Sequence, residues 1–125
     1  MTPKVHLFVY GTLQRGQTAH ALLAGQEFVR EACTLPLYRL YDRGRHPCLV
    51  EDRELGEAVQ GEIWRIDADL LATLDDYEEA GDLFERREIQ IADFDGAPVQ
   101  AYFYKGEVST MRSCGSRWPA QGTCS

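Results

Sequence analysis

The stretch FVYGTLQRGQT, residues 8–18, is the first whose residue types and spacing could do chemistry. Gly11 and Gly16 have the G-x-x-x-x-G spacing of a phosphate-binding loop, and Thr18 stands where such a loop places its magnesium-binding hydroxyl. The position that should be lysine is Gln17, which supplies no charge for the β- and γ-phosphates. We therefore set nucleotide hydrolysis aside. What remains is either a plain structural turn or a turn whose backbone N–H groups bind a carboxylate or an oxyanion.

The second candidate is the acidic stretch LDDYEEAGD, residues 74–82. Negative charge is disfavoured near a helix C-terminus, so solvation alone explains this run poorly. At about 100° per residue, three leucines and Tyr77 of the predicted helix form one apolar stripe, and Glu78 falls inside it. The neighbouring carboxylates that fall outside the stripe are Asp75, Asp76 and Glu79.

Glu78 therefore points in the same direction as the leucines, and two explanations remain open. The carboxylate could pair with a buried cation, for which Arg86 and Arg87 are the candidates. Alternatively, it could serve a site as a general base, because desolvation raises the pKa of a carboxyl group toward neutrality.

The bulk properties of the chain exclude several classes of protein. Its 125 residues suffice for one domain with its own core. The net charge of −7 argues against a nucleic-acid partner, because binding to phosphates requires a basic surface. No apolar run is long enough to span a bilayer and the N-terminus lacks a signal-peptide pattern, so we expect a cytoplasmic protein without a membrane partner. The cysteines and histidines match no metal-site spacing, and we expect neither metal nor cofactor.

The order of the predicted elements indicates an α+β fold with a mostly β core and two helices packed against it. Strand-forming sequence occupies residues 5–10, 28–41, 58–66, 86–94 and 98–104. A short helix is predicted over residues 18–24, and a second helix begins after an N-cap at Asp67 and ends at Gly81. Asp95-Gly96, between the last two strands, is a hairpin signal.

Several motifs, taken in order, resemble the γ-glutamylcyclotransferase-like family. They are YGTL at residues 10–13 followed by Gly16, LYDRGRHP at residues 40–47, VQGEIWRI at residues 59–66, LDDYE at residues 74–78, and the arginine of FER at Arg86. YGTL alone is weakly specific, but its combination with G-E-[IV]-[WY] and L-D-x-[YF]-E at this spacing is a strong signal. The match runs from about Val5 to Tyr104.

The resemblance implies a small mixed β-barrel flanked by two helices, with a cavity between the YGTL loop and the acidic helix. It implies that Glu78, which the helical angles also select, is the catalytic glutamate. The substrate-binding residues that it implies are Tyr10, Gly11, Thr12, Leu13 and Arg86.

The family reaction is intramolecular: the α-amino group of a γ-glutamyl unit attacks its own γ-carbonyl, and the products are 5-oxoproline and a free amine. Because the nucleophile belongs to the substrate, no protein nucleophile, metal or cofactor is needed. The implied activity is a cyclotransferase that acts on a small γ-glutamyl amine or amide; the leaving amine and the oligomeric state stay open.

The alternative is a non-catalytic module on the same fold that binds a small amino acid or lactam. Glu78 favours the enzyme, because a cyclotransferase needs this base and a binding module does not.

We expect residues 1–106 to form the domain and residues 107–125 to form a C-terminal tail. The tail is rich in Ser and Gly and lacks periodicity, so it should be the most mobile part of the chain. If Trp118 docks over the cavity, the tail is a lid instead.

Overall fold

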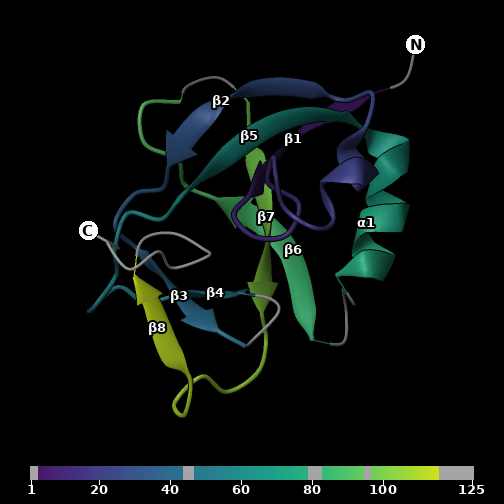
Figure 1. Cartoon of the computed structure of the whole chain (residues 1–125). Coiled ribbons are helices and arrows are strands. Elements are labelled where there is room, and N and C mark those ends of the chain that lie inside the picture. Colours follow the sequence, from purple (N-terminus) through teal and green to yellow (C-terminus); the bar gives the residue numbers. More distant parts are fainter. Residues whose placement is uncertain (1–2, 44–46, 79–82, 95–96, 116–125) are drawn as a thin grey trace.

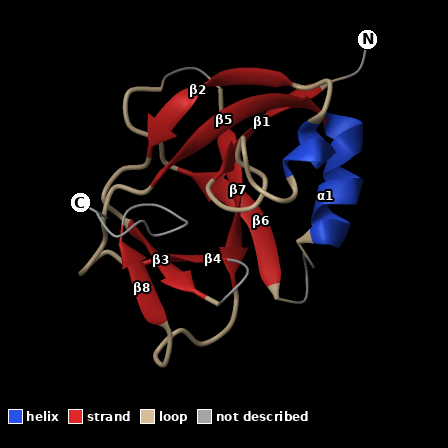
Figure 2. Ribbon diagram, viewed as in Figure 1, coloured by secondary structure: helices blue, strands red, loops and turns tan. Residues whose placement is uncertain are grey.

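The molecule is built from two β-sheets, with its helices gathered beside the larger one (Figures 1 and 2). The computed structural model describes residues 3–43, 47–78, 83–94 and 97–115 of the chain. Its strands are β1 (Lys4–Val9), β2 (Glu27–Cys33), β3 (Tyr38–Asp42), β4 (Pro47–Glu51), β5 (Gln60–Asp67), β6 (Phe84–Ile89), β7 (Val99–Tyr104) and β8 (Arg112–Gly115). Its helices are α1 (Leu71–Tyr77) and two short 3₁₀ segments, η1 (His20–Leu23) and η2 (Ala68–Leu70).

The larger sheet has the strand order β2-β5-β1-β7-β6, and the smaller has the order β4-β3-β8. All neighbouring strands are antiparallel except β1 and β7, which run parallel. This arrangement confirms the α+β prediction. Over the described residues neither sheet closes on itself, so the word barrel fits the molecule only loosely.

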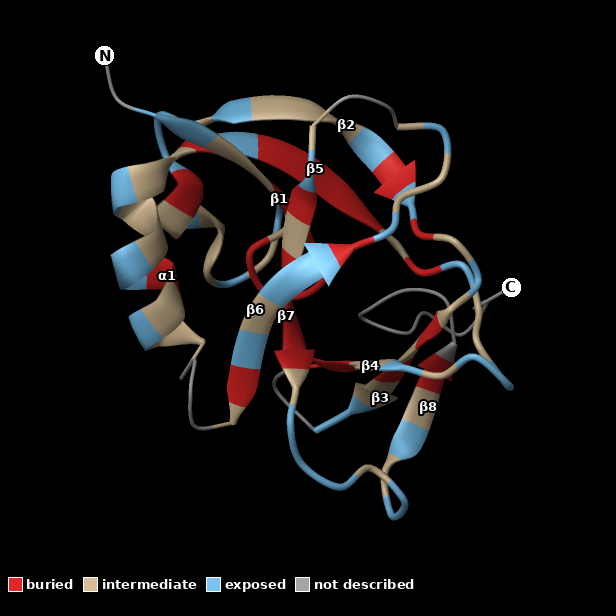
Figure 3. Cartoon of the chain, turned by 180° about the vertical axis from the view of Figure 1, so that it is seen from behind, coloured by how far each residue is buried: buried red, intermediate tan, exposed pale blue. Residues whose placement is uncertain are grey.

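Strand β1 is apolar at most positions because both of its faces are buried. Leu7 and Val9 belong to a core beneath the helices, which also contains Leu23 of η1 and Leu74 of α1. Phe8 alternates with them and faces a second core, shared with the smaller sheet. Figure 3 shows β7 buried along much of its length in the same way. A strand buried on both faces lacks the simple alternation of a half-buried strand.

The helix that carries the acidic run differs from its prediction at the start. Asp67 makes no capping hydrogen bond; its side chain instead contacts Lys4 and Gln26. Asp67 thus stands at the predicted N-cap position, immediately before η2, but its carboxylate bonds to these neighbouring side chains and does not cap the helix. The helix itself ends at Tyr77, and Gly81, its predicted stop, lies outside the described residues.

Two other local predictions, a short helix near residue 20 and a hairpin near the C-terminal end of the larger sheet, are confirmed with changes in detail. The short helix near residue 20 is the 3₁₀ segment η1, and Gly25 follows it at a φ of 81°, in the left-handed region that favours glycine. Strands β6 and β7 form the predicted hairpin, with Ile89 opposite Val99. Their connection, residues 90–98, is longer than a two-residue turn, and Asp95-Gly96 lies outside the described residues.

Part of the segment predicted to be a tail belongs to the smaller sheet. Strand β8 pairs with β3, with Ser113 opposite Tyr41 and Arg112 opposite Asp42. Trp118 and the rest of residues 116–125 lie outside the described residues. Over the described part of the chain, no helix is long and apolar enough to cross a membrane.

Candidate active site

The loop that follows β1 forms one wall of the candidate site. The carbonyl of Gly11 accepts a hydrogen bond from the Gln14 N–H at 3.0 Å. The carbonyl of Thr12 accepts one from the Ala19 N–H at 2.9 Å. Within residues 3–43, 47–78, 83–94 and 97–115, the N–H groups of Gly11, Thr12 and Leu13 donate to no other backbone group. These donors are the kind that a backbone anion site uses.

Gly11 lets this loop lie directly against the smaller sheet. A β-carbon at Gly11 would be 2.7 Å from Cγ and 2.9 Å from Cδ of Pro47, the first residue of β4. Both distances are far shorter than the 3.5–4.0 Å of an ordinary contact between carbon atoms. A glycine is therefore needed here for the close approach of a proline ring.

A buried carboxylate on β5 holds the other end of the loop. Glu62 accepts hydrogen bonds from the backbone N–H and from Nε of Arg15, each at 3.1 Å, and from the indole N–H of Trp64 at 3.0 Å. A buried charge is tolerated when it is paired and hydrogen-bonded, as Glu62 is. The motif G-E-I-W thus positions the loop that precedes it by about fifty residues.

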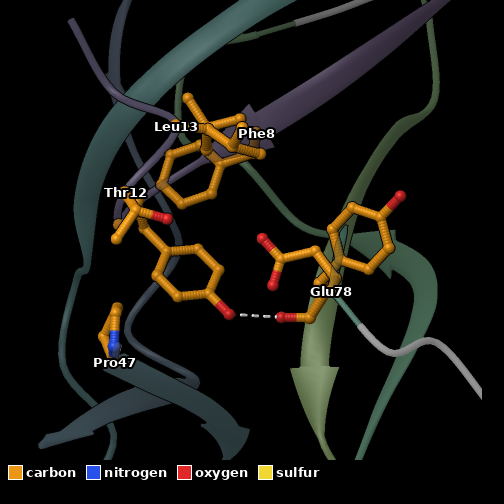
Figure 4. A pocket seen from close by; sticks show the side chains of 9 residues that line it. Phe8, Thr12, Leu13, Pro47 and Glu78 are labelled. Atoms are coloured by element: carbon orange, nitrogen blue, oxygen red, sulfur yellow. Dashed lines mark hydrogen bonds between the residues drawn. The ribbon is translucent and has the colours of Figure 1, made fainter. Parts of the chain in front are cut away.

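Glu78 approaches the loop from the end of α1. Its backbone N–H donates to the carbonyl of Leu74 at 2.8 Å, so Glu78 is the first residue after the helix. Figure 4 shows its carboxylate directed across the pocket toward the side where Thr12 and Leu13 lie. Glu78 is partly buried, and desolvation raises the pKa of its carboxyl group to about 7.

The loop and the helix end enclose a pocket with an empty volume of about 330 Å³, its open mouth included. The pocket is lined by Glu78 and the four residues of the YGTL loop, together with Phe8, Val9, Pro47 and Tyr102. All the predicted site residues except Arg86 therefore meet in one place, although Glu78 is far from the loop in sequence.

Arg86 lies behind the pocket wall. Its guanidinium pairs with the carboxylate of Asp75 on α1. The same carboxylate oxygen accepts a hydrogen bond from the Tyr102 hydroxyl at 2.6 Å. Arg86 is thus connected to the pocket through Tyr102 and is absent from its lining.

The ion pairs of the two arginines bear on the competing explanation for Glu78. Arg86 pairs with Asp75, and Arg87 lies 3.4 Å from Glu51 and 3.7 Å from Glu85. Among the described residues, no cation forms an ion pair with Glu78. The structure therefore offers no support for Glu78 as a member of a structural ion pair.

Two tyrosines complete the polar part of the pocket. The Tyr10 hydroxyl donates to the backbone carbonyl of Tyr102 at 2.5 Å. The pKa of Tyr10 is raised well above its ordinary value, first by burial and then by the negative charge of Glu78. Burial also raises the pKa of Tyr102. Both hydroxyls therefore remain protonated at neutral pH and can act only as donors or neutral acceptors.

Sequence reasoning did not identify Pro47 and Tyr102 as pocket residues. Pro47 lies outside the predicted strands but begins β4, and Tyr102 is one of several aromatic residues on β7. Glu62 carried a signal that could have been used, because it is a carboxylate inside the apolar run of a predicted strand.

The arrangement is suited to proton transfer next to a group held by the loop. A carboxyl group with a pKa of about 7 can accept and return a proton near neutral pH. Cys48, next to Pro47, is buried, and burial raises the pKa of its thiol to about 12, so it is not a thiolate nucleophile at neutral pH. Within the described ranges, no three His, Cys, Asp or Glu residues lie together in a way that could hold a metal ion.

Comparisons with known proteins identify a matching family and related sequences. Residues 7–120 match the family described as "Gamma-glutamyl cyclotransferase, AIG2-like". The chain is 34% identical over 113 residues to the γ-glutamylaminecyclotransferase of Rattus norvegicus, covering 79% of this chain and 76% of that protein.

Two solved structures have similar folds. One is a uropathogenic E. coli-specific protein, with a TM-score of 0.75 and 30% identity, covering 89% of this chain and 87% of that one. The other is an AIG2-like protein from Mus musculus, with a TM-score of 0.68 and 30% identity, covering 82% of this chain and 77% of that one.

Proposed function

Because the chain belongs to the γ-glutamyl cyclotransferase, AIG2-like family, we propose that it cleaves a γ-glutamyl amine or amide to 5-oxoproline and a free amine. The name of the rat relative supports a γ-glutamyl amine as the substrate class. The observation that carries the proposal is the Glu78 carboxyl group, which faces the YGTL loop across the pocket and has a pKa of about 7.

In the proposed mechanism the loop binds the substrate through its backbone. The N–H groups of Gly11, Thr12 and Leu13 are directed to the α-carboxylate of the γ-glutamyl unit or to the oxyanion that forms at its γ-carbonyl. Holding the flexible glutamyl chain in a folded conformation brings the α-nitrogen close to the γ-carbon. Such positioning converts the attack into a favourable intramolecular step and can contribute several kcal/mol.

Glu78 moves the protons in this mechanism. Its carboxylate first takes a proton from the α-ammonium group, and the resulting amine attacks the γ-carbonyl carbon. Glu78 then protonates the departing nitrogen, so that the carbon–nitrogen bond to the leaving amine breaks. The attacking nitrogen loses a second proton as it becomes the lactam N–H, and this proton leaves through Glu78 to the released amine or to solvent.

The proposal is tested with a panel of γ-glutamyl compounds, assayed for 5-oxoproline by mass spectrometry. The panel contains glutathione, γ-glutamyl amino acids, γ-glutamyl-ε-lysine and smaller γ-glutamyl amines. We expect wild-type protein to turn over at least one of them. We expect Glu78→Gln to lower turnover by about 10²–10⁴-fold while substrate affinity changes much less, because the loop retains its contacts.

Asp76→Asn is the matched control, because Asp76 is an exposed carboxylate two residues earlier, on α1. This variant should behave like the wild type. If Glu78→Gln folds and turns over substrate normally, Glu78 is not the base. If the wild type binds these compounds but releases no 5-oxoproline, the protein is a binding module on the same fold.

A further inference from the structure

The Glu78 carboxylate enters the pocket just after a helix of only seven residues. Among the described residues, it takes part in no ion pair and no side-chain hydrogen bond. Helix ends fray, and the partial negative charge at a helix C-terminus disfavours a cluster of carboxylates there. Other contacts must therefore hold this end of α1 in place.

The residue before Glu78 supplies one such contact. The Tyr77 hydroxyl lies 2.6 Å from Oγ1 of Thr12, a hydrogen bond in which either group can be the donor. Thr12 is buried and belongs to the loop that lines the pocket. This bond joins the end of α1 directly to the proposed substrate-binding loop.

Asp75, three residues before Glu78, supplies the second contact. Its carboxylate accepts hydrogen bonds from Tyr102 of β7, at 2.6 Å, and from Arg86 of β6. The backbone carbonyl of Tyr102 in turn accepts the hydroxyl of Tyr10 at 2.5 Å. Asp75 thus ties α1 to the sheet strand that forms another wall of the pocket, and Arg86 neutralises its charge.

Residues three apart lie on the same side of a helix, so Asp75 and Glu78 are near neighbours, whereas Tyr77 points to the loop. We propose that Asp75 and Tyr77 are positioning residues, which fix the end of α1 from two sides and thereby hold the Glu78 carboxylate in the pocket. Their catalytic consequence rests on the proposed function. In this proposal, neither Asp75 nor Tyr77 contacts the substrate. The pattern L-D-D-Y-E then has a physical explanation: the glutamate acts, and its two neighbours place it.

The test uses Tyr77→Phe, which removes one hydroxyl without changing charge, and Asp75→Asn, which breaks the contact with the sheet. We expect kcat to fall by about 10- to 100-fold in each variant while KM changes by less than about threefold, the scale expected for misplacing a catalytic group. Tyr41→Phe and Asp76→Asn are the matched controls, since Tyr41 lies in the smaller sheet and Asp76 is exposed.

Thr12 provides a check on the first contact. Thr12→Ser keeps the hydroxyl that faces Tyr77, and Thr12→Val removes it. We expect Thr12→Val to lower kcat more than Thr12→Ser does, because only Thr12→Val removes this hydrogen bond. The double variant Tyr77→Phe with Thr12→Val should lose little more than the worse single variant, because both changes remove the same hydrogen bond.

A second readout does not depend on turnover. In protein labelled with ¹³C at the glutamate carboxyl carbons, NMR follows the titration of Glu78, whose signal is identified by its absence from Glu78→Gln. The wild-type midpoint should lie near 7, and Tyr77→Phe should move it by about one unit toward the ordinary value of 4.5, because a loosened carboxylate reaches water. Asp75→Asn also leaves the charge of Arg86 unpaired, and this charge would itself lower the pKa of Glu78. The titration test therefore depends on Tyr77→Phe, which changes no charge.

The outcomes separate the two proposals. A lowered kcat together with a shifted Glu78 titration supports the positioning roles. If both variants fold, keep the wild-type kcat and leave the Glu78 titration unchanged, the positioning proposal is overturned. If no γ-glutamyl compound is turned over but the titration shifts in Tyr77→Phe, the positioning proposal stands and the proposed function fails.

Discussion

At the scale of single residues, the proposed chemistry depends on one carboxyl group in an unusual environment. Glu78 is partly buried beside the loop, and Arg86, one of its two candidate partners, is engaged by Asp75. No cation among the described residues pairs with Glu78, so desolvation raises its pKa to about 7. A glutamate with the ordinary value of 4.5 would be too weak a base for the same task.

The first residue-scale prediction concerns the pH dependence of activity. Glu78 must be ionised to accept a proton, so we expect kcat/KM to fall about tenfold per pH unit below a midpoint near 7. Steady-state rates measured between pH 5 and 9 check this. Asp76→Asn should keep the same acidic limb. A midpoint near 4.5 would show that the base is an ordinary, solvated carboxylate.

The second residue-scale prediction concerns the pH dependence of stability. The pKa of Glu78 is higher in the folded protein than in the unfolded chain, so the folded state binds its proton more tightly. The contribution of this group to stability is full below about pH 4.5 and is lost as pH rises through about 7. At pH 8 the loss is at most about 3–4 kcal/mol, the full value of the pKa shift.

Glu78→Gln removes this pH-dependent loss. We therefore expect Glu78→Gln to be more stable than the wild type at pH 8 and to differ little from it at pH 4.5, as measured by chemical denaturation at both values. Equal differences at the two pH values would mean that the environment of Glu78 does not favour its protonated form.

At the scale of elements, the site lies where several of them meet: strand β1 and the loop after it, the start of β4, the end of α1 and strand β7. The close approach of Gly11 to Pro47 sets the distance between the two sheets at this point. The buried Glu62 fixes the far side of the loop from β5. Small changes at these contacts should therefore move the loop as a unit.

The element-scale prediction tests the contact between the loop and β4. Gly11 is not in the left-handed region, so Gly11→Ala is strained only by the overlap of its β-carbon with Pro47. We expect Gly11→Ala to lower the free energy of unfolding by about 1–3 kcal/mol. The cost should be smaller in a Pro47→Ala background, which removes the Cγ and Cδ atoms that the new β-carbon meets. Equal costs in the two backgrounds would exclude this overlap as the cause.

At the scale of the whole molecule, the smaller sheet depends on a strand near the end of the chain. Strand β8 covers one edge of β3, and Cys114 contributes to the core between the sheets. The expected domain boundary at residue 106 leaves this strand out, although it takes part in the same core. The second sheet in turn supplies Pro47 to the pocket.

The whole-molecule prediction compares two truncations. A chain that ends at Gly106 lacks β8 and exposes the edge of β3, so we expect it to be several degrees less stable in thermal unfolding than a chain that ends at Gly115. Assaying the longer truncation also tests whether residues 116–125 act as a lid: an altered KM supports a lid, and an unaltered KM excludes it. Equal stability of the two truncated chains would show that β8 is dispensable.

The sequence by itself determined the class of fold, most of the elements and the residue on which the proposed chemistry depends. Helical periodicity identified Glu78, because 3.6 residues per turn places it on the same face of the helix as the leucines a few residues earlier. The glycines and the apolar strand before them likewise located the loop. Helix periodicity and turn signals both depend on residues that are close in the chain, so the sequence alone reveals them. The family resemblance added the expectation that Glu78 and the loop lie at the same cavity.

Only the tertiary structure decided which residues surround Glu78. Asp75 and Arg86 are both charged residues near it in sequence, yet they pair with each other, which leaves Glu78 desolvated and unpaired among the described residues. Pro47 and Tyr102 reach the pocket from β4 and β7, and the sequences of these strands do not indicate which elements pack beside them. Local periodicity fixes which face a side chain occupies, whereas its partners, and hence its pKa, follow from the packing of distant elements.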